Sequence, residues 1–137
     1  MYVTPHIFFG GNCIQAMEHY EKAFGVKVAT IVRYNDTPPQ EGFAAIPGSE
    51  NLISHASLEF ERGQIYFCDF PPGESPVIGN NVGITVEFES SEKVQAAFKV
   101  LAEGGSVDME PQKTFWCGCF CSVTDKFGIG WHIATSE

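Results

Sequence analysis

Basic residues are scarce in this sequence, in which 8 Lys and Arg stand against 17 Asp and Glu and give a formal charge of −9. Binding to nucleic acid or to an anionic membrane needs clustered Lys and Arg that meet phosphate groups. The charge therefore argues against both kinds of partner. A long apolar run is also missing, since no stretch approaches the ~20 residues of a membrane span, and no basic segment precedes an apolar one at the start. We expect a soluble, cytoplasmic protein.

Motifs for cofactors and for a serine nucleophile are absent as well. Gly128-x-Gly130 has no further glycine, helix start or acidic partner after it, and Gly10-Gly11 lacks the spacing of a dinucleotide fingerprint. The sequence contains neither a P-loop nor a nucleophile elbow. We therefore expect no nucleotide cofactor.

The five cysteines do not suggest a disulfide framework, because their number is odd and no small secreted scaffold surrounds them. Three of them alternate along one predicted strand and share a face, with neighbours roughly 6.5 to 7 Å apart. We expect reduced thiols that are buried as small apolar residues. A soft-metal site that joins these three to Cys68 or His132 is the alternative. The three are Cys117, Cys119 and Cys121.

With 137 residues, the chain is long enough for one domain that buries about 68% of its unfolded surface. Asn12 and Gln15 suit a helix cap and predict a helix over residues 13–24, whereas Ser90 or Ser91 predicts a helix over 91–103. Runs rich in β-branched and aromatic residues predict eight strands. These are Val3 to Phe9, Val26 to Tyr34, Leu52 to Phe60, Gln64 to Phe70, Gly83 to Phe88, Val107 to Met109, Phe115 to Val123 and Ile129 to Ala134.

Each half of the chain therefore has the order β-α-β-β-β. The two helices are offset by about 80 residues, which suits a duplicated half-domain better than a solenoid. Residues 35–51 and 71–80, rich in Pro, Gly, Asn and Ser, are predicted loops, and the second of them joins the halves. We predict a single domain over 1–137, composed of two modules at about 1–77 and 80–137.

Several short motifs resemble the PhnB-like branch of the glyoxalase, bleomycin-resistance and extradiol-dioxygenase superfamily, also called vicinal oxygen chelate proteins. The resemblance extends from about Val3 to Ile133. It implies an α+β fold in which two β-α-β-β-β modules form a curved mixed sheet around a cupped ligand cavity, and it implies pairing as a homodimer. The motifs are Phe8-Phe9-Gly10-Gly11-Asn12-Cys13, His55-Ala56, Gly79-Asn80-Asn81, Thr114-Phe115-Trp116 and Val123-Thr124-Asp125-Lys126-Phe127-Gly128.

The resemblance also implies a site for one divalent metal ion, formed by His or Glu at four inward strand positions, which would polarise a carbonyl or activate water or oxygen. Only one of the four matching positions carries a convincing ligand, His132, so the usual site is incomplete. If the matching is wrong by one residue, His6 takes the place of Pro5 as a candidate ligand. The four positions fall near Pro5, Phe67 or Asp69, Gly83 or Thr85, and His132.

His55 shares a strand face with Ser57 and Glu59, and this face points either into a polar cavity or into solvent. His55 and His132 are the candidate metal ligands, and His55, Glu59 and His132 are the candidate catalytic residues, as bases or acids. We predict that the small-molecule ligand contacts four further side chains. These are Phe67, Asp69, Thr85 and Trp116.

Two functions fit this sequence. One is a metal-assisted lyase, isomerase or oxygenase that acts on a small polar or aromatic molecule. The other is a noncatalytic protein that sequesters such a molecule in an aromatic cleft, a function that needs no metal. The resemblance implies both, because one fold hosts several chemistries, so whether the protein is an enzyme stays open here.

Overall fold

The computed structural model describes residues 1–36 and 48–136, so residues 37–47 of the predicted loop 35–51 lie outside the described part. The chain divides into two compact units. The first unit comprises Met1–Glu21 and Gly25–Val77, and the second comprises Lys22–Phe24 and Ile78–Glu137. Each unit contains one four-stranded mixed sheet and is described below by itself.

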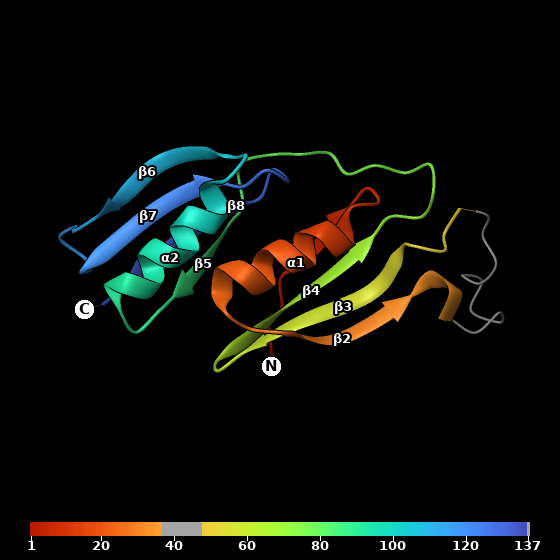
Figure 1. Cartoon of the computed structure of the whole chain (residues 1–137), viewed down its shortest axis with the longest axis horizontal. Helices are drawn as coiled ribbons and strands as arrows, with labels where there is room; N and C mark the ends of the chain where they lie inside the picture. The colour runs from red at the N-terminus through yellow and green to blue at the C-terminus, as the bar shows by residue number, and fades with distance from the viewer. Residues whose placement is uncertain (37–47, 137) are drawn as a thin grey trace. The chain divides into compact units, whose positions relative to one another are not determined.

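The first sheet has the strand order β1-β4-β3-β2, with β1 parallel to β4 and the other pairs antiparallel (Figure 1). The second sheet repeats this topology in the order β5-β8-β7-β6, with β5 parallel to β8. The elements of the first sheet and its helices are β1 (His6–Phe9), α1 (Cys13–Phe24), β2 (Val28–Arg33), the 3₁₀ helix η1 (Tyr34–Asp36), β3 (Ile53–Phe60) and β4 (Gly63–Asp69). Those that follow are β5 (Gly83–Glu87), α2 (Ser91–Ala102), β6 (Ser106–Gln112), β7 (Cys119–Thr124) and β8 (Gly130–Thr135).

The predicted order of elements and the α+β class are confirmed. The first helix has the predicted bounds, and the second ends one residue earlier than predicted. Each has 12 residues, and no helix in the described ranges 1–36 and 48–136 combines the length and the apolar character needed to cross a bilayer.

The prediction for residues 115 to 118 was wrong, because β7 begins only at Cys119. Thr114 and Cys117 close a turn in which the Thr114 N–H donates to the Cys117 carbonyl at 3.1 Å and the Cys117 N–H donates to Thr114 Oγ1 at 3.1 Å. Phe115 and Trp116 therefore lie in this turn, and both are exposed.

The two helix starts are stabilised in different ways. Ser90 caps α2 as predicted, since its Oγ accepts the Lys93 N–H at 3.3 Å. The Asn12 side chain makes no such bond at α1. There the buried carboxylate of Asp69 accepts the N–H groups of Gly11 and Cys13 at 2.9 and 3.0 Å, so a residue distant in sequence performs the capping.

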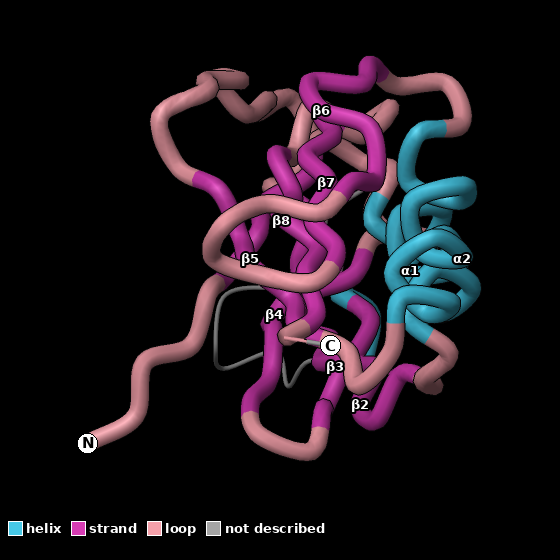
Figure 2. Tube along the Cα trace, turned by 90° about the vertical axis from the view of Figure 1, so that its left-hand side faces the viewer, coloured by secondary structure: helices cyan, strands magenta, loops and turns pink. Residues whose placement is uncertain are grey.

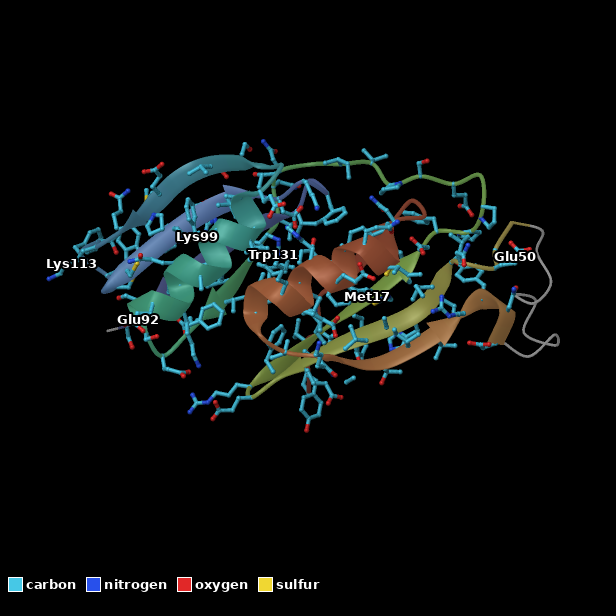
Figure 3. The ribbon with its side chains drawn as sticks, viewed as in Figure 1. Met17, Glu50, Glu92, Lys99, Lys113 and Trp131 are labelled. Atoms are coloured by element: carbon cyan, nitrogen blue, oxygen red, sulfur yellow. The ribbon has the colours of Figure 1, made fainter. Side chains whose placement is uncertain are left out.

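Each helix covers one face of the sheet in its own unit (Figures 1 and 2). In the first unit, Tyr20 of α1 stacks on Phe67 of β4 with ring centroids 5.7 Å apart. In the second unit, α2 packs on β7 and β8, and its buried Val94, Ala97 and Leu101 point into that core. Met17 and Trp131, labelled in Figure 3, belong to the cores of their respective units.

Strand alternation places the remaining side chains of each sheet on the opposite side, which we call its open face. Polar and aromatic groups gather there, because the face that the helix covers is the one that buries apolar surface. The open face of the first sheet includes His6, His55 and Tyr66, and that of the second includes Thr85, Ser122 and His132.

Two buried aspartates hold the ends of strands in place. Besides binding the start of α1, Asp69 accepts the Ile53 N–H at 2.9 Å, and its carbonyl accepts the Tyr34 hydroxyl at 2.7 Å. Asp125 has a similar role after β7. Its carboxylate accepts the N–H groups of Phe127 and Ile129 and the indole N–H of Trp131.

The cysteines are reduced, and four of the five are buried. Cys119 and Cys121 lie on the covered face of β7, as the buried-thiol interpretation predicted, whereas Cys117 precedes the strand. The alternative soft-metal site with His132 is wrong for this pair, because His132 lies on the open face of the same sheet. Burial raises the pKa of Cys121 to about 11 and likewise that of Cys68, and it raises the pKa of Cys13 further.

We predict that replacing Asp69 by Ala lowers the free energy of unfolding by about 3 to 5 kcal/mol. Each hydrogen bond to a charged group contributes about 1.5 to 3 kcal/mol, and losses within one network do not add fully. Urea denaturation measures the change. Asp36→Ala is the matched control, because the exposed carboxylate of Asp36 accepts one N–H, from Arg33 at 3.3 Å. This variant should lose much less free energy of unfolding than Asp69→Ala. Equal losses in the two variants would contradict this role of Asp69.

We also predict that one thiol, that of Cys117, reacts with Ellman's reagent far ahead of the others. The thiolate is the reactive form, and a raised pKa keeps a buried thiol protonated at about pH 8. Cys117 is half-buried, whereas the other four are buried with raised pKa values. Cys117→Ser should remove the fast phase, and guanidinium should release all remaining thiols. A fast phase that survives in Cys117→Ser would refute the assignment.

Candidate functional site

The open face of the second sheet carries a row of hydrogen-bonding side chains. His132 of β8 pairs in register with Thr85 of β5 on one side and with Ser122 of β7 on the other, so the three side chains lie side by side. They line a cavity of about 560 Å³, within the size range of small-molecule sites. Asn80, Asn81, Asp108 and Thr124 contribute further polar groups to its wall.

Glycines keep the space around the His132 ring open. A Cβ at Gly83 would lie 3.7 Å from both Cδ2 and Nε2 of His132, so the hydrogen that glycine has there leaves one flank of the imidazole uncovered. Gly130 lies two residues before His132 on the same face and also lines the cavity. His132 itself is exposed and accessible to a ligand.

An aromatic row extends from His132 toward the turn before β7. His132 meets Phe120 edge-on at 5.5 Å, Phe120 meets Trp116 at 5.6 Å, and Trp116 meets Phe115 at 4.8 Å between ring centroids. Trp116 is 56% exposed, so much of its ring is accessible. The site thus combines hydrogen-bonding groups with an aromatic surface, and His132 belongs to both.

The charge near this cavity is negative. Asp108 is the charged residue among the described residues that line it, and its carboxylate accepts the Thr124 hydroxyl at 3.2 Å. A neutral or weakly cationic ligand fits this setting better than an anion, because no lining Lys or Arg from residues 1–36 and 48–136 offsets the carboxylate.

The sequence-predicted residues are divided between the two units. Thr85, His132 and Trp116 belong to the second unit, where Thr85 and His132 are neighbours and the aromatic row links Trp116 to His132. His55 lies on the open face of the first sheet, where its ring meets Tyr66 at 4.7 Å. Glu59 is exposed farther along the same face, at a position paired with Gln64.

Phe67 and Asp69 were wrongly predicted to contact a ligand. Both lie on the covered face of β4 and are at most 1% exposed. Phe67 stacks on Tyr20 of the core, and both carboxylate oxygens of Asp69 accept backbone N–H groups. A shift of one residue along β4 would bring Phe67 to the open-face position that Tyr66 occupies, and Asp69 to that of Cys68.

Sequence reasoning missed Phe120, Ser122 and Tyr66. The alternation that places Cys119 and Cys121 on the covered face of β7 also places Phe120 and Ser122 on the open face. On β4 the same alternation places Tyr66 on the face opposite to that of its neighbour Phe67, so it was a usable signal for Tyr66.

The metal positions implied by the resemblance shift in the same way in the first unit, where the open-face pair is His6 with Tyr66 in place of Pro5 with Phe67 or Asp69. In the second unit the open-face pair is Thr85 with His132, which the matching had already given. Across residues 1–36 and 48–136, no group of three or more His, Cys, Asp or Glu side chains could hold an ion. Neutral Tyr and Thr hydroxyls are poor partners for Zn²⁺, so the residues of either unit do not fit a metal site of the usual kind.

Comparison with known proteins agrees with the fold. Protein YjdN of Escherichia coli (strain K12) is 28% identical over 140 residues, which cover 97% of this chain and 94% of the relative. The crystal structure of PA1353 from Pseudomonas aeruginosa superposes with a TM-score of 0.85 at 26% identity, covering 99% of this chain and 98% of that one.

A further solved structure, titled a putative 3-demethylubiquinone-9 3-methyltransferase, PhnB protein, from Bacillus cereus, shares the fold with a TM-score of 0.77 at 21% identity. The two chains are covered to 98% and 99%. The model of the Glyoxalase/Bleomycin resistance protein/Dioxygenase superfamily matches residues 5–133, nearly the whole chain. The protein belongs to this superfamily, as its motifs and its two β-α-β-β-β units indicate.

Proposed function

We propose that this protein binds a small, planar, uncharged molecule on the open face of its second sheet. The observation that supports this proposal is the cavity of about 560 Å³ in which His132, Thr85 and Ser122 stand next to the aromatic row that leads to Trp116. Polar groups would fix the orientation of the ligand, and aromatic surface would supply most of the contact area.

The three polar side chains suit a ligand with two neighbouring oxygens. A neutral imidazole offers one donor and one acceptor, and each hydroxyl of Thr85 and Ser122 can donate or accept. Because the three lie side by side across three strands, two adjacent hydroxyl or carbonyl oxygens could each reach a partner. The planar part of such a ligand would rest against Trp116 and Phe120, where aromatic pairs contribute about 0.5 to 1.5 kcal/mol each.

Catechol, which combines an aromatic ring with two neighbouring hydroxyls, is the probe that tests this function. We expect the indole N–H signal of Trp116 and the amide signals of Ser122 and His132 to shift saturably in ¹H–¹⁵N NMR spectra. The Trp131 indole is an internal reference, since it is buried and donates to Asp125 at 2.8 Å. His132→Asn and Trp116→Ala should each weaken binding about tenfold, the equivalent of one hydrogen bond or one aromatic contact.

Two controls separate specific binding from adsorption. Lys99→Ala changes an exposed side chain of α2, on the other side of the same unit, and should leave the affinity for catechol unchanged. Cyclohexane-1,2-diol keeps both oxygens but lacks the aromatic ring, so it should bind more weakly. If the Trp116 signal does not respond to catechol, or if His132→Asn binds it with the affinity of the unaltered protein, the proposal is wrong.

The catalytic alternative, a metal-assisted lyase, isomerase or oxygenase, depends on an ion, and among the described residues 1–36 and 48–136 neither unit offers a full set of ligands for one. We therefore rank binding above catalysis and derive no reaction step for His55, Glu59 or His132. The divalent ion stays a prediction, as do the homodimer and the cytoplasmic location.

Elemental analysis of untagged protein purified without chelator, together with its mass in solution, tests the ion and the dimer. The donor sets lead us to expect substoichiometric metal, and the family resemblance leads us to expect a dimer. About one metal ion per chain that is lost in both His55→Ala and His132→Ala would instead favour the enzyme.

A further inference from the structure

Two cysteines flank a glycine between the turn that closes at Cys117 and the start of β7. Cys117 is half-buried, whereas Cys119, the first residue of β7, is 5% exposed. Trp116 of this turn belongs to the proposed site, but neither cysteine contributes to the function proposed above. The pair thus carries chemistry that this function does not use.

The side chain of Cys117 lies along the backbone of Cys119. Its thiol donates to the Cys119 carbonyl, with Sγ and oxygen 3.4 Å apart. The chain bends at Gly118, so the separation of roughly 6.5 to 7 Å that two residues span in an extended strand does not apply here. Burial raises the pKa of Cys119, and the Cys117 thiol raises it further, so the two groups are close enough to interact.

Gly118 makes a bond between the two sulfurs geometrically accessible. Disulfides need Cα atoms about 4.4 to 6.8 Å apart, which favours a bent link over an extended one. Glycine bends at little cost because it lacks a Cβ, and the Gly118 N–H stays anchored by donating to the Thr135 carbonyl at 3.0 Å. Cys119 and Cys121 instead lie two residues apart within the regular strand β7, at the upper limit for a bridge.

The two thiols differ in their access to solvent, which gives them different roles in thiol exchange. Cys117 is the one that a small molecule reaches first. At the buried Cys119, a hydrogen bond from the hydroxyl of Ser91, the first residue of α2, opposes the rise in pKa. A thiolate there forms beside a helix start, where backbone N–H groups favour negative charge. Cys119 therefore suits the second step, an attack within the chain.

We propose that Cys117 and Cys119 form a reversible disulfide by exchange with a small-molecule disulfide, and that this bond displaces the turn that holds Trp116. The Cys117 thiol loses its proton to water, and its thiolate attacks one sulfur of the small molecule, whose S–S bond breaks and releases one thiolate. The Cys119 thiolate, formed in the same way, then attacks Sγ of Cys117 and expels the second thiolate. Two protein thiols are thereby oxidised, and one small disulfide is reduced to two thiolates.

The new bond changes the contacts that hold the turn. In the reduced chain, Cys117 Sγ lies 3.4 Å from Thr114 Oγ1 and 3.4 Å from the Cys119 carbonyl oxygen. An oxidised sulfur has no hydrogen to donate, and a bond to Cys119 draws it toward the covered face of β7. Trp116 directly precedes Cys117 and meets Phe120 at 5.6 Å, so this movement should alter the aromatic row. Its effect on ligand affinity rests on the proposed function, whereas the disulfide does not.

Ellman's reagent, itself a small disulfide, tests the exchange at about pH 8. Cys117 attacks the reagent first, as predicted above, and the unaltered protein should then release about two thionitrobenzoate anions per chain and end two hydrogens lighter, without an adduct. Cys119→Ala should release about one anion and keep the adduct on Cys117, and Cys117→Ser should release none in the fast phase. Cys121→Ala, the matched control on the same face of β7, should behave as the unaltered protein.

Peptide mapping locates the bond without any variant. After the remaining thiols are alkylated with N-ethylmaleimide in guanidinium, the tryptic fragment 114–126 contains all three cysteines of this segment. We expect the alkyl group on Cys121 alone. An alkyl group on Cys119, or one released anion with a stable adduct in the unaltered protein, overturns the disulfide.

The indole N–H signal of Trp116 reports the effect on the turn. We expect this signal to move in ¹H–¹⁵N NMR spectra on oxidation and to return with dithiothreitol, while that of the buried Trp131 stays in place. Catechol should bind the oxidised protein about tenfold more weakly, as expected for Trp116→Ala. A Trp116 signal that does not move overturns the displacement of the turn. If catechol binds neither form, the proposed function fails, while the anion count still decides the disulfide.

Discussion

The carboxylate of Asp69 accepts backbone N–H groups from two segments that are far apart in the sequence, the turn before α1 and the start of β3. Its own carbonyl receives the Tyr34 hydroxyl, so η1 is fixed to the same point. Buried N–H groups are costly when they lack acceptors, and here one residue at the end of β4 satisfies three of them. The first unit depends on this contact, because it sets where α1 begins relative to the sheet.

The second unit has the same topology with a different solution at its strand ends. Asp125 binds two N–H groups of its own turn and the indole of Trp131, and Ser90 caps α2 locally. In both units the buried carboxylate accepts three N–H groups, which suits a structural role. The acidic residues that a motif comparison makes conspicuous are thus not always the residues that a ligand meets.

Chemistry-bearing side chains instead gather on the open faces. In the second unit they form a polar cavity whose His132 ring contacts Phe120, and in the first unit they form a cluster of two imidazoles and a phenol. The two surfaces differ in their chemical groups, since the carboxylate of Asp108 borders one and imidazole and phenol rings form the other. Members of this superfamily differ in chemistry on one fold, and such surfaces are where those differences arise.

The sequence by itself determined both helices, the order of elements and the duplication, because caps, periodicity and turn residues act over short distances. It also named His132, Thr85 and Trp116 as candidate site residues; in the structure, Thr85 and His132 are neighbours on the open face of the second sheet, and Phe120 links His132 to Trp116 in the turn before β7. Only the tertiary structure decided which face of β4 is open, since a one-residue shift exchanges Tyr66 for Phe67. Likewise, only packing showed that Asp69 is buried, because its N–H partners come from Gly11, Cys13 and Ile53, which no local pattern connects to it.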